Sequence, residues 1–137
     1  MHQKTPSEGI NFNRMPCIYW SDAMKMSLLQ RRIIVHSILY YECDESVISD
    51  KQYDALSKQL VNLMKQSPEQ LKRTQYYYCM YDFDGSTGFD LRSRLTTKDN
   101  EYLTKIALSV LHSYKSTCRK GGRQYVTNQI VNKTRCT

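Results

Sequence analysis

The stretch "LYYECDESVISDKQYDAL", residues 39–56, contains the end of one predicted helix and the start of the next. Its segment 49–52, Ser-Asp-Lys-Gln, is a capping box, in which the serine side chain and the glutamine side chain each bond the other residue's backbone amide. Residues 50–66 then place apolar side chains on one stripe: Tyr53, Leu56, Leu60, Leu63 and Met64. The stretch therefore predicts a helical hairpin whose bend carries tyrosines and aspartates.

The helix before this bend is predicted to begin after Ser21, a favourable N-cap, and to run to about Glu42. Its apolar residues fall on two opposite sides. One side carries Met24, Leu28, Val35, Ile38 and Leu39, and the other carries Met26, Leu29, Ile33 and Tyr40. Because a helix that is apolar on two sides must be covered on both, we expect this helix to be central.

A third long helix is predicted from Thr97 to Tyr114, before the breaking pair Gly121 and Gly122. Ser67 and Pro68 favour a short helical turn after the hairpin. The aromatic residues 76–83 fit either a short strand or a buried helical turn, and both alternatives stay open. The predicted fold class is mainly α: a compact helical domain built on an antiparallel helix hairpin and a third long helix, with one short β element near 75–83 as an alternative.

The chain has 137 residues, 40% of them apolar, which is enough for one domain with its own core. We expect an N-terminal arm at 1–20, a helical domain at 21–118 with the hairpin at 22–66, and a basic C-terminal segment at 119–137. The first residues lack the apolar core of a secretory signal, so we expect a soluble cytoplasmic protein with no membrane partner. Five scattered cysteines predict thiols rather than a disulfide framework.

The positive charge is concentrated in the last third of the chain. Residues 1–90 hold 10 Lys and Arg against 11 Asp and Glu, whereas residues 91–137 hold 10 against 2. Such a segment attracts polyanions, either nucleic acid or an acidic protein surface, although it can equally be a solvated surface. The candidate residues for such a partner are Lys115, Arg119, Lys120, Arg123, Lys133 and Arg135.

Other candidate sites are weak. His2, His36 and His112 are far apart in the sequence, and we expect the last two to be packed or solvent-facing. The acidic loop "DFDGSTG", residues 82–88, has neither an EF-hand pattern nor a P-loop lysine. We therefore predict no metal site and interpret this loop as a turn or a lid.

The opening stretch resembles the N-terminal module, domain Ia, of bacterial NAD-dependent DNA ligases, whose pattern is Y-[HY]-x-x-D-x-P-x-I-[SP]-D-x-x-Y-D-x-L. The resemblance covers about residues 29–66 and implies binding of the nicotinamide mononucleotide half of NAD. By position, Tyr40 and Tyr53 match the aromatic residues that hold the nicotinamide, and Asp50 and Asp54 match the acids that contact it and its ribose. Tyr41 stands where the family usually has histidine, which puts a phosphate contact in doubt.

Independent physical reasoning agrees with this resemblance. Oxidised nicotinamide is a flat cation, so aromatic faces can stack on it and carboxylates can balance its charge. Asp50 and Asp54 are four residues apart on a helix and so lie on one face. The same tyrosines could instead pack in the core, and the whole role of Asp50 could be to complement the helix dipole. Both this structural alternative and a different ligand in the same cleft stay open.

The resemblance does not extend to catalysis. Ligases of this family need a K-x-D-G lysine that takes up AMP, and the nearest string here, residues 82–85, has aspartate in that position. We therefore expect no complete ligase but a non-catalytic protein that binds NAD or nicotinamide mononucleotide through Tyr40, Tyr41, Asp50, Tyr53 and Asp54. A short module of this kind suits a phage or mobile-element gene.

Two alternatives remain. One is an interaction or inhibitor module whose basic third binds nucleic acid or an acidic host protein. The other is one subunit of a split enzyme.

Overall fold

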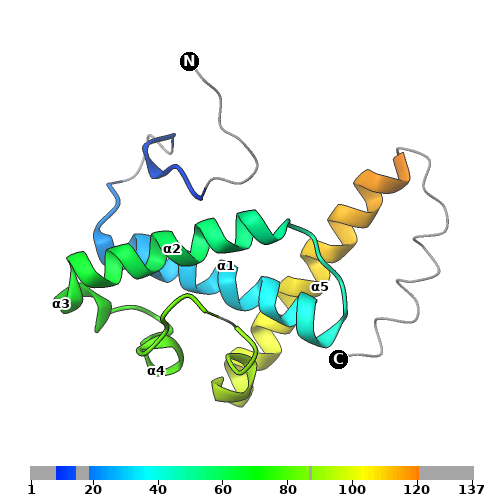
Figure 1. Cartoon of the computed structure of the whole chain (residues 1–137). Coiled ribbons are helices and arrows are strands. Elements are labelled where there is room, and N and C mark those ends of the chain that lie inside the picture. Colours follow the sequence, from blue (N-terminus) through cyan, green and yellow to red (C-terminus); the bar gives the residue numbers. More distant parts are fainter. Residues whose placement is uncertain (1–8, 15–18, 87, 121–137) are drawn as a thin grey trace.

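The computed structural model describes residues 9–14, 19–86 and 88–120. Its elements are η1 (Phe12–Arg14), α1 (Asp22–Glu42), α2 (Asp50–Gln66), α3 (Pro68–Leu71), α4 (Tyr77–Met80), η2 (Arg92–Arg94) and α5 (Thr97–Lys120). Figure 1 shows α1 and α2 running in opposite directions, with α5 crossing α1. No strand occurs in the described ranges, so the predicted mainly α fold is confirmed.

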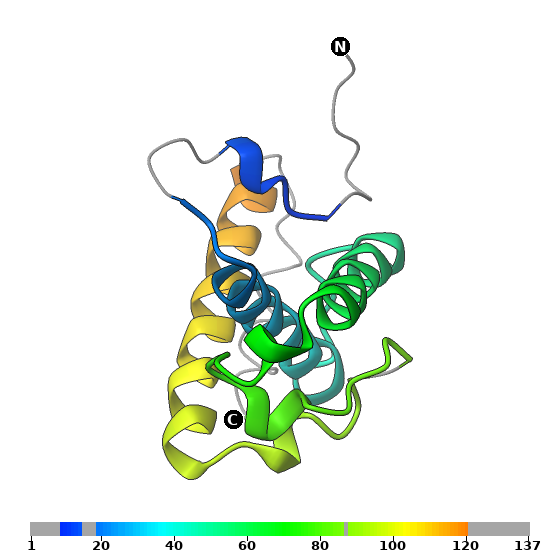
Figure 2. The same cartoon turned by 90° about the vertical axis from the view of Figure 1, so that its left-hand side faces the viewer.

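Helix α1 is the centre of the fold. Its start is capped by Ser21, whose hydroxyl accepts from the Met24 amide at 3.2 Å. The view in Figure 2 shows α1 between α2 and α5. Its buried residues come from more than one side of the helix, among them Met26, Leu29, Ile33, Ile34, Ile38 and Leu39. The prediction of a central helix is confirmed, although Met24 and Tyr40, near the two ends of α1, are 42% and 53% exposed.

The α1–α2 hairpin has the predicted boundaries. The capping box is formed: the Gln52 amide donates to Ser49 Oγ at 3.1 Å, and the Ser49 amide donates to Gln52 Oε1 at 2.9 Å. Leu56 and Leu60 of α2 are buried in the core. At the far end of the hairpin the Ser67 hydroxyl donates to the Asp22 carboxylate, which joins the end of α2 to the start of α1.

Residues 76–83, which fitted either a short strand or a buried helical turn, contain a helical turn. Residues 77–80 form the single turn α4, so the alternative of a strand near 75–83 is wrong. The reason is the buried side chain of Gln30 in α1: its amide nitrogen donates to Thr74 Oγ1 at 2.9 Å, and its oxygen accepts from the Tyr76 amide at 3.1 Å. The backbone before α4 is thus satisfied by a helix side chain rather than by a neighbouring strand.

Helix α5 is longer than its apolar pattern predicted, because it continues past Tyr114 to Lys120. The expected boundary between a helical domain and a basic segment at 118 and 119 therefore falls inside this helix. Arg92 anchors the start of α5, donating to Asn100 at 2.8 Å and Thr104 at 3.2 Å, and it pairs with Glu42 at the end of α1 at 3.0 Å.

The described end of the N-terminal arm packs on the hairpin. Ile10 exchanges two hydrogen bonds with the Gln59 side chain, of 2.9 and 2.8 Å, and Phe12 is buried with its ring 4.9 Å from that of Trp20. Cys43 and Cys79 are buried thiols. Among the described helices, none is both long enough and apolar enough to cross a bilayer.

Candidate functional site

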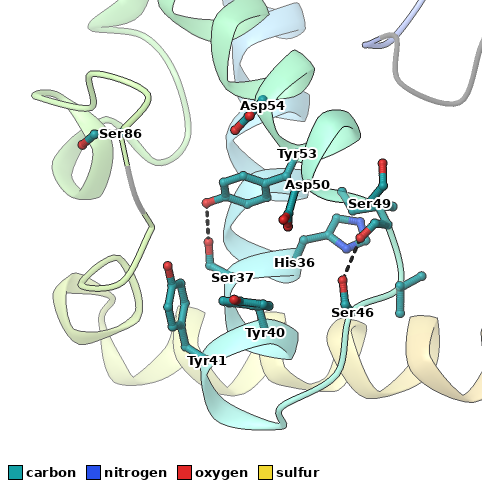
Figure 3. A pocket seen from close by; sticks show the side chains of 12 residues that line it. His36, Ser37, Tyr40, Tyr41, Ser46, Ser49, Asp50, Tyr53, Asp54 and Ser86 are labelled. Carbon is teal, nitrogen blue, oxygen red and sulfur yellow. Dashed lines mark hydrogen bonds between the residues drawn. The ribbon is translucent and has the colours of Figure 1, made fainter.

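A cavity of about 170 Å³ lies at the bend of the hairpin, where the last turns of α1, the connecting loop and the first turns of α2 meet. Figure 3 shows the side chains around it. The lining residues are His36, Ser37, Tyr40, Tyr41, Ser46, Val47, Ile48, Ser49, Asp50, Tyr53, Asp54 and Ser86. A cavity of about 150 Å³ is known to accommodate one benzene ring, so this one has room for a single six-membered ring.

All five nucleotide-site residues predicted from the sequence line this one cavity. Tyr40 and Tyr41 come from the last turn of α1, and Asp50, Tyr53 and Asp54 come from the first two turns of α2. The capping box sets where α2 begins and so fixes which of its residues face back toward α1. In Figure 3 the Asp50 carboxylate points into the space between Tyr53 and Tyr40.

Tyr53 is held in one orientation across the cavity. Its hydroxyl and Ser37 Oγ share a hydrogen bond of 2.8 Å, and burial raises the pKa of the Tyr53 phenol, so it is neutral at physiological pH. Gly88 packs against this pair, because a Cβ added at Gly88 would collide with both Ser37 Oγ and the Tyr53 hydroxyl. The segment that follows α4 thus packs directly against two residues that line the cavity.

The mouth of the cavity is aromatic. The rings of Tyr40 and Tyr41 meet edge to face with centroids 4.8 Å apart, and Tyr41 meets Phe89 in the same way at 5.4 Å. Tyr40 and Tyr41 are 53% and 41% exposed. These two tyrosines are therefore not core residues, and both line the cavity, where a guest can contact them.

The connecting loop is held by α1, by α5 and by a hydrogen bond within the loop itself. The Glu45 amide donates to the Leu39 carbonyl at 2.9 Å, and Ser46 Oγ donates to the Ile48 carbonyl at 2.7 Å. The Glu45 carboxylate pairs with Lys115 of α5 at 3.2 Å, with side chains only 11% and 5% exposed. Helix α5 therefore fixes the wall of the cavity without lining it.

His36 is a lining residue that the sequence interpretation did not include. Its Nδ1 is buried and has no hydrogen-bond partner in the part of the chain that the structure describes. Burial, with a smaller effect from Arg32, lowers the pKa of His36 from 6.5 to about 4, so its ring is uncharged at neutral pH. The sequence did contain a signal for including His36, because it lies four residues before Tyr40 and so on the same face of α1.

The acidic loop is a turn beside the cavity. Asp82 pairs with Arg94 at 2.6 Å, and Asp84 accepts from the Ser86 amide at 2.9 Å and from its hydroxyl at 2.6 Å. Gly85 has a φ of 87°, which favours glycine. Asp82 is thus paired with η2 and Asp84 is bonded within the loop, and no group of three potential metal ligands occurs in the described ranges.

Of the six residues predicted to form a basic surface, the structure describes the side chain of Lys115 alone. Lys115 is buried and paired with Glu45, so its charge does not face a polyanion, contrary to the expectation from the sequence. The backbone of Arg119 and Lys120 forms the last turn of α5. Arg123, Lys133 and Arg135 lie outside the described residues.

Comparison with known protein families finds a family model that matches the helices around this cavity. Residues 21–79 match the family model of the DNA ligase-like, N-terminal NAD+-binding domain. No curated protein and no solved structure matches the chain. The ligase-like segment, as we call residues 21–79, extends beyond the predicted 29–66, and it contains α1, α2, α3 and most of α4.

The ligase-like segment contains all but one of the residues that line the cavity, and the match indicates an NAD+-related binding module. The exception is Ser86, which lies beyond the match in the loop after α4. Gly88, which packs against Ser37 and Tyr53, and Lys115, which pairs with Glu45 of the connecting loop, also lie outside the ligase-like segment.

Proposed function

We propose that this protein is a non-catalytic binding protein that recognises NAD or nicotinamide mononucleotide through the nicotinamide end of the ligand. The observation that carries the proposal is the convergence of Tyr40, Tyr41, Asp50, Tyr53 and Asp54 on one cavity. Its volume of about 170 Å³ suits one flat ring. The match of the ligase-like segment to an NAD+-binding family supports the same ligand class.

Each residue type has a physical role toward such a ligand. The nicotinamide ring of NAD+ is cationic, and a tyrosine face against it contributes about 0.5 to 2 kcal/mol. Asp50 and Asp54 supply negative charge at the same cavity, and Tyr53 is oriented by its 2.8 Å hydrogen bond to Ser37. A neutral, flat guest of the same size gains the packing but not the charge complementarity, so oxidised nicotinamide is favoured over its reduced form.

The proposal is for binding rather than catalysis because of what occupies the loop after α4. Asp82 stands where the ligase lysine is needed, and a carboxylate cannot form the phosphoramide with AMP. Asp82 is moreover paired with Arg94 of η2 at 2.6 Å, so its carboxylate already has a cationic partner.

Isothermal titration calorimetry with NAD and nicotinamide mononucleotide tests the proposal. We expect Asp50→Asn and Tyr40→Leu to weaken binding by about tenfold each, since each removes one charge or one ring contact. Glu69→Gln on α3 and Tyr102→Leu on α5 are matched controls, because both side chains are exposed and neither lines the cavity. Absence of binding heat with both ligands at millimolar concentration would end the proposal.

A further inference from the structure

A second hollow, of about 280 Å³, adjoins the nucleotide cavity at the bend of the hairpin. It lies between α1, α2 and the described end of the N-terminal arm, and the lining residues that matter here are Arg32 and His36 of α1, Ile48 of the connecting loop and Gln52 of α2. His36 and Ile48 also line the cavity. The two spaces are therefore neighbours with a common wall.

The two spaces have opposite charge. Asp50 and Asp54 are the charged residues that line the cavity, whereas Arg32 is the charged residue among those described that line the hollow. The Arg32 side chain is exposed, and it forms no ion pair with an acid in the described part of the chain. A guanidinium offers a fork of donors that matches the oxygens of a phosphate. The chemistry of the hollow therefore suits an anion.

The start of α2 adds to the positive character of the hollow. The side-chain oxygen of Gln52 accepts from the Ser49 amide at 2.9 Å, while its side-chain nitrogen donates to no other described residue. Lys51, in the same turn, is exposed and forms no ion pair with a described acid. The capping box occupies the amides of Ser49 and Gln52 but not those of Asp50 and Lys51. Together with the helix dipole, these donors favour an anion beside Arg32.

The position of the hollow suits the shape of a mononucleotide. In such a ligand the ribose separates the flat ring from the phosphate, and here the side chain of His36 stands between the cavity and the hollow. Arg32 lies one turn before His36 on α1, close enough for its charge to lower the pKa of the imidazole. Figure 3 shows His36 on the side of the cavity opposite Tyr41. A phosphate in the hollow is therefore remote from Tyr41, the position where the ligase pattern usually has histidine.

We propose that Arg32 binds the 5′-phosphate of the ligand in this hollow, so that the protein selects nicotinamide mononucleotide over nicotinamide riboside, which lacks the phosphate. This inference rests on the proposed function and names the residue that recognises the phosphate. At neutral pH the phosphate carries about 1.5 to 2 negative charges, and the ring carries one positive charge. The ring faces Asp50 and Asp54 and the phosphate faces Arg32, so each end of the ligand meets the opposite charge.

Calorimetry on the full chain with the mononucleotide and the riboside tests this inference. We expect the mononucleotide to bind about tenfold more tightly than the riboside at low salt. The ratio should shrink at high salt, because salt screens the attraction between the phosphate and an exposed arginine. Equal affinities, or tighter binding of the riboside, overturn the inference but leave the proposed function standing. Failure of both ligands to bind overturns both.

Substitutions at Arg32 test the assignment of the phosphate to this residue. Arg32→Gln removes the charge from an exposed side chain, so the affinity for the mononucleotide should fall about tenfold and that for the riboside should change by less than about twofold. Riboside binding also shows that the variant is folded. Arg32→Lys keeps the charge but not the fork of donors, and it should retain part of the preference for the mononucleotide.

Arg31→Gln is the matched control, because Arg31 is the neighbouring arginine on α1 but lines a different hollow. It should leave the affinities for both ligands unchanged. The inference is overturned if Arg32→Gln keeps the full preference for the mononucleotide, if it weakens both ligands equally, or if Arg31→Gln reduces the preference as much.

Discussion

The buried pair of Lys115 and Glu45 gives the sharpest prediction about stability. Its side chains are 5% and 11% exposed and their charged atoms lie 3.2 Å apart. The second carboxylate oxygen of Glu45 is buried and has no partner in the described part of the chain. Lys115→Met keeps much of the volume and the helix propensity but leaves the Glu45 carboxylate buried without its cation.

We expect Lys115→Met to lower the free energy of unfolding by about 3 to 5 kcal/mol, the usual cost of removing one partner from a buried pair. An exposed pair would cost only about 0 to 1 kcal/mol. Because small domains are stable by about 5 to 15 kcal/mol, the loss is a large fraction of the total. Urea unfolding followed by circular dichroism measures it.

Two further variants test whether the loss of the Lys115–Glu45 pair is what lowers the free energy of unfolding. Lys105→Met changes an exposed lysine on the same helix and should alter stability by less than about 0.5 kcal/mol. Glu45→Gln combined with Lys115→Met removes the stranded charge and should restore part of the loss. If Lys115→Met costs no more than Lys105→Met, or if Glu45→Gln gives no recovery, the pair does not hold the connecting loop as argued.

Three other predictions concern the cavity itself. Gly88→Ala should destabilise the fold by about 1 to 3 kcal/mol through the collision with Ser37 and Tyr53, whereas Ser86→Ala, which loses only an exposed hydrogen bond to Asp84, should cost less than about 0.5 kcal/mol in thermal melts. Tyr53→Phe should cost about 0.5 to 1.5 kcal/mol by breaking the hydrogen bond to Ser37, and a cost equal to that of Tyr102→Phe would refute it. His36 has a folded-state pKa of about 4 against 6.5 when unfolded, so the unfolded chain takes up the proton first and stability falls as the pH drops through this window. Between about pH 7 and about pH 5 this loss should reach about 2 kcal/mol and should be absent from His36→Gln, as urea unfolding at the two pH values can show.

The hairpin was predictable because its signals are local. The caps Ser21 and Ser49 each bond an amide within three residues, so the starts of α1 and α2 can be found without knowing the rest of the fold. The predicted site residues came from the resemblance to ligase domain Ia, and the hairpin explains why they lie together, since a fixed bend places the end of one helix beside the start of the next. Their assignment to a nicotinamide ligand came from the resemblance to ligase domain Ia and not from the helix pattern.

Other features depended on contacts between distant parts of the chain. Residues 76–83 are aromatic enough for a strand, and the turn α4 forms because Gln30, more than forty residues earlier, satisfies the backbone before it. Lys115 looks like one more member of a basic segment until α5 packs against the loop that carries Glu45. A sequence shows that a residue is charged, but it does not show whether that residue is buried or which residue it pairs with.

The sequence by itself determined the helical class, the two capped helices and the set of tyrosines and aspartates at their bend, because caps and helical periodicity act over a few residues. Only the tertiary structure decided that His36 joins this set as an uncharged ring, that Gly88 packs against the Ser37–Tyr53 hydrogen bond, and that Lys115 is buried against Glu45. These three outcomes depend on desolvation and close packing, which arise only when segments far apart in the chain meet.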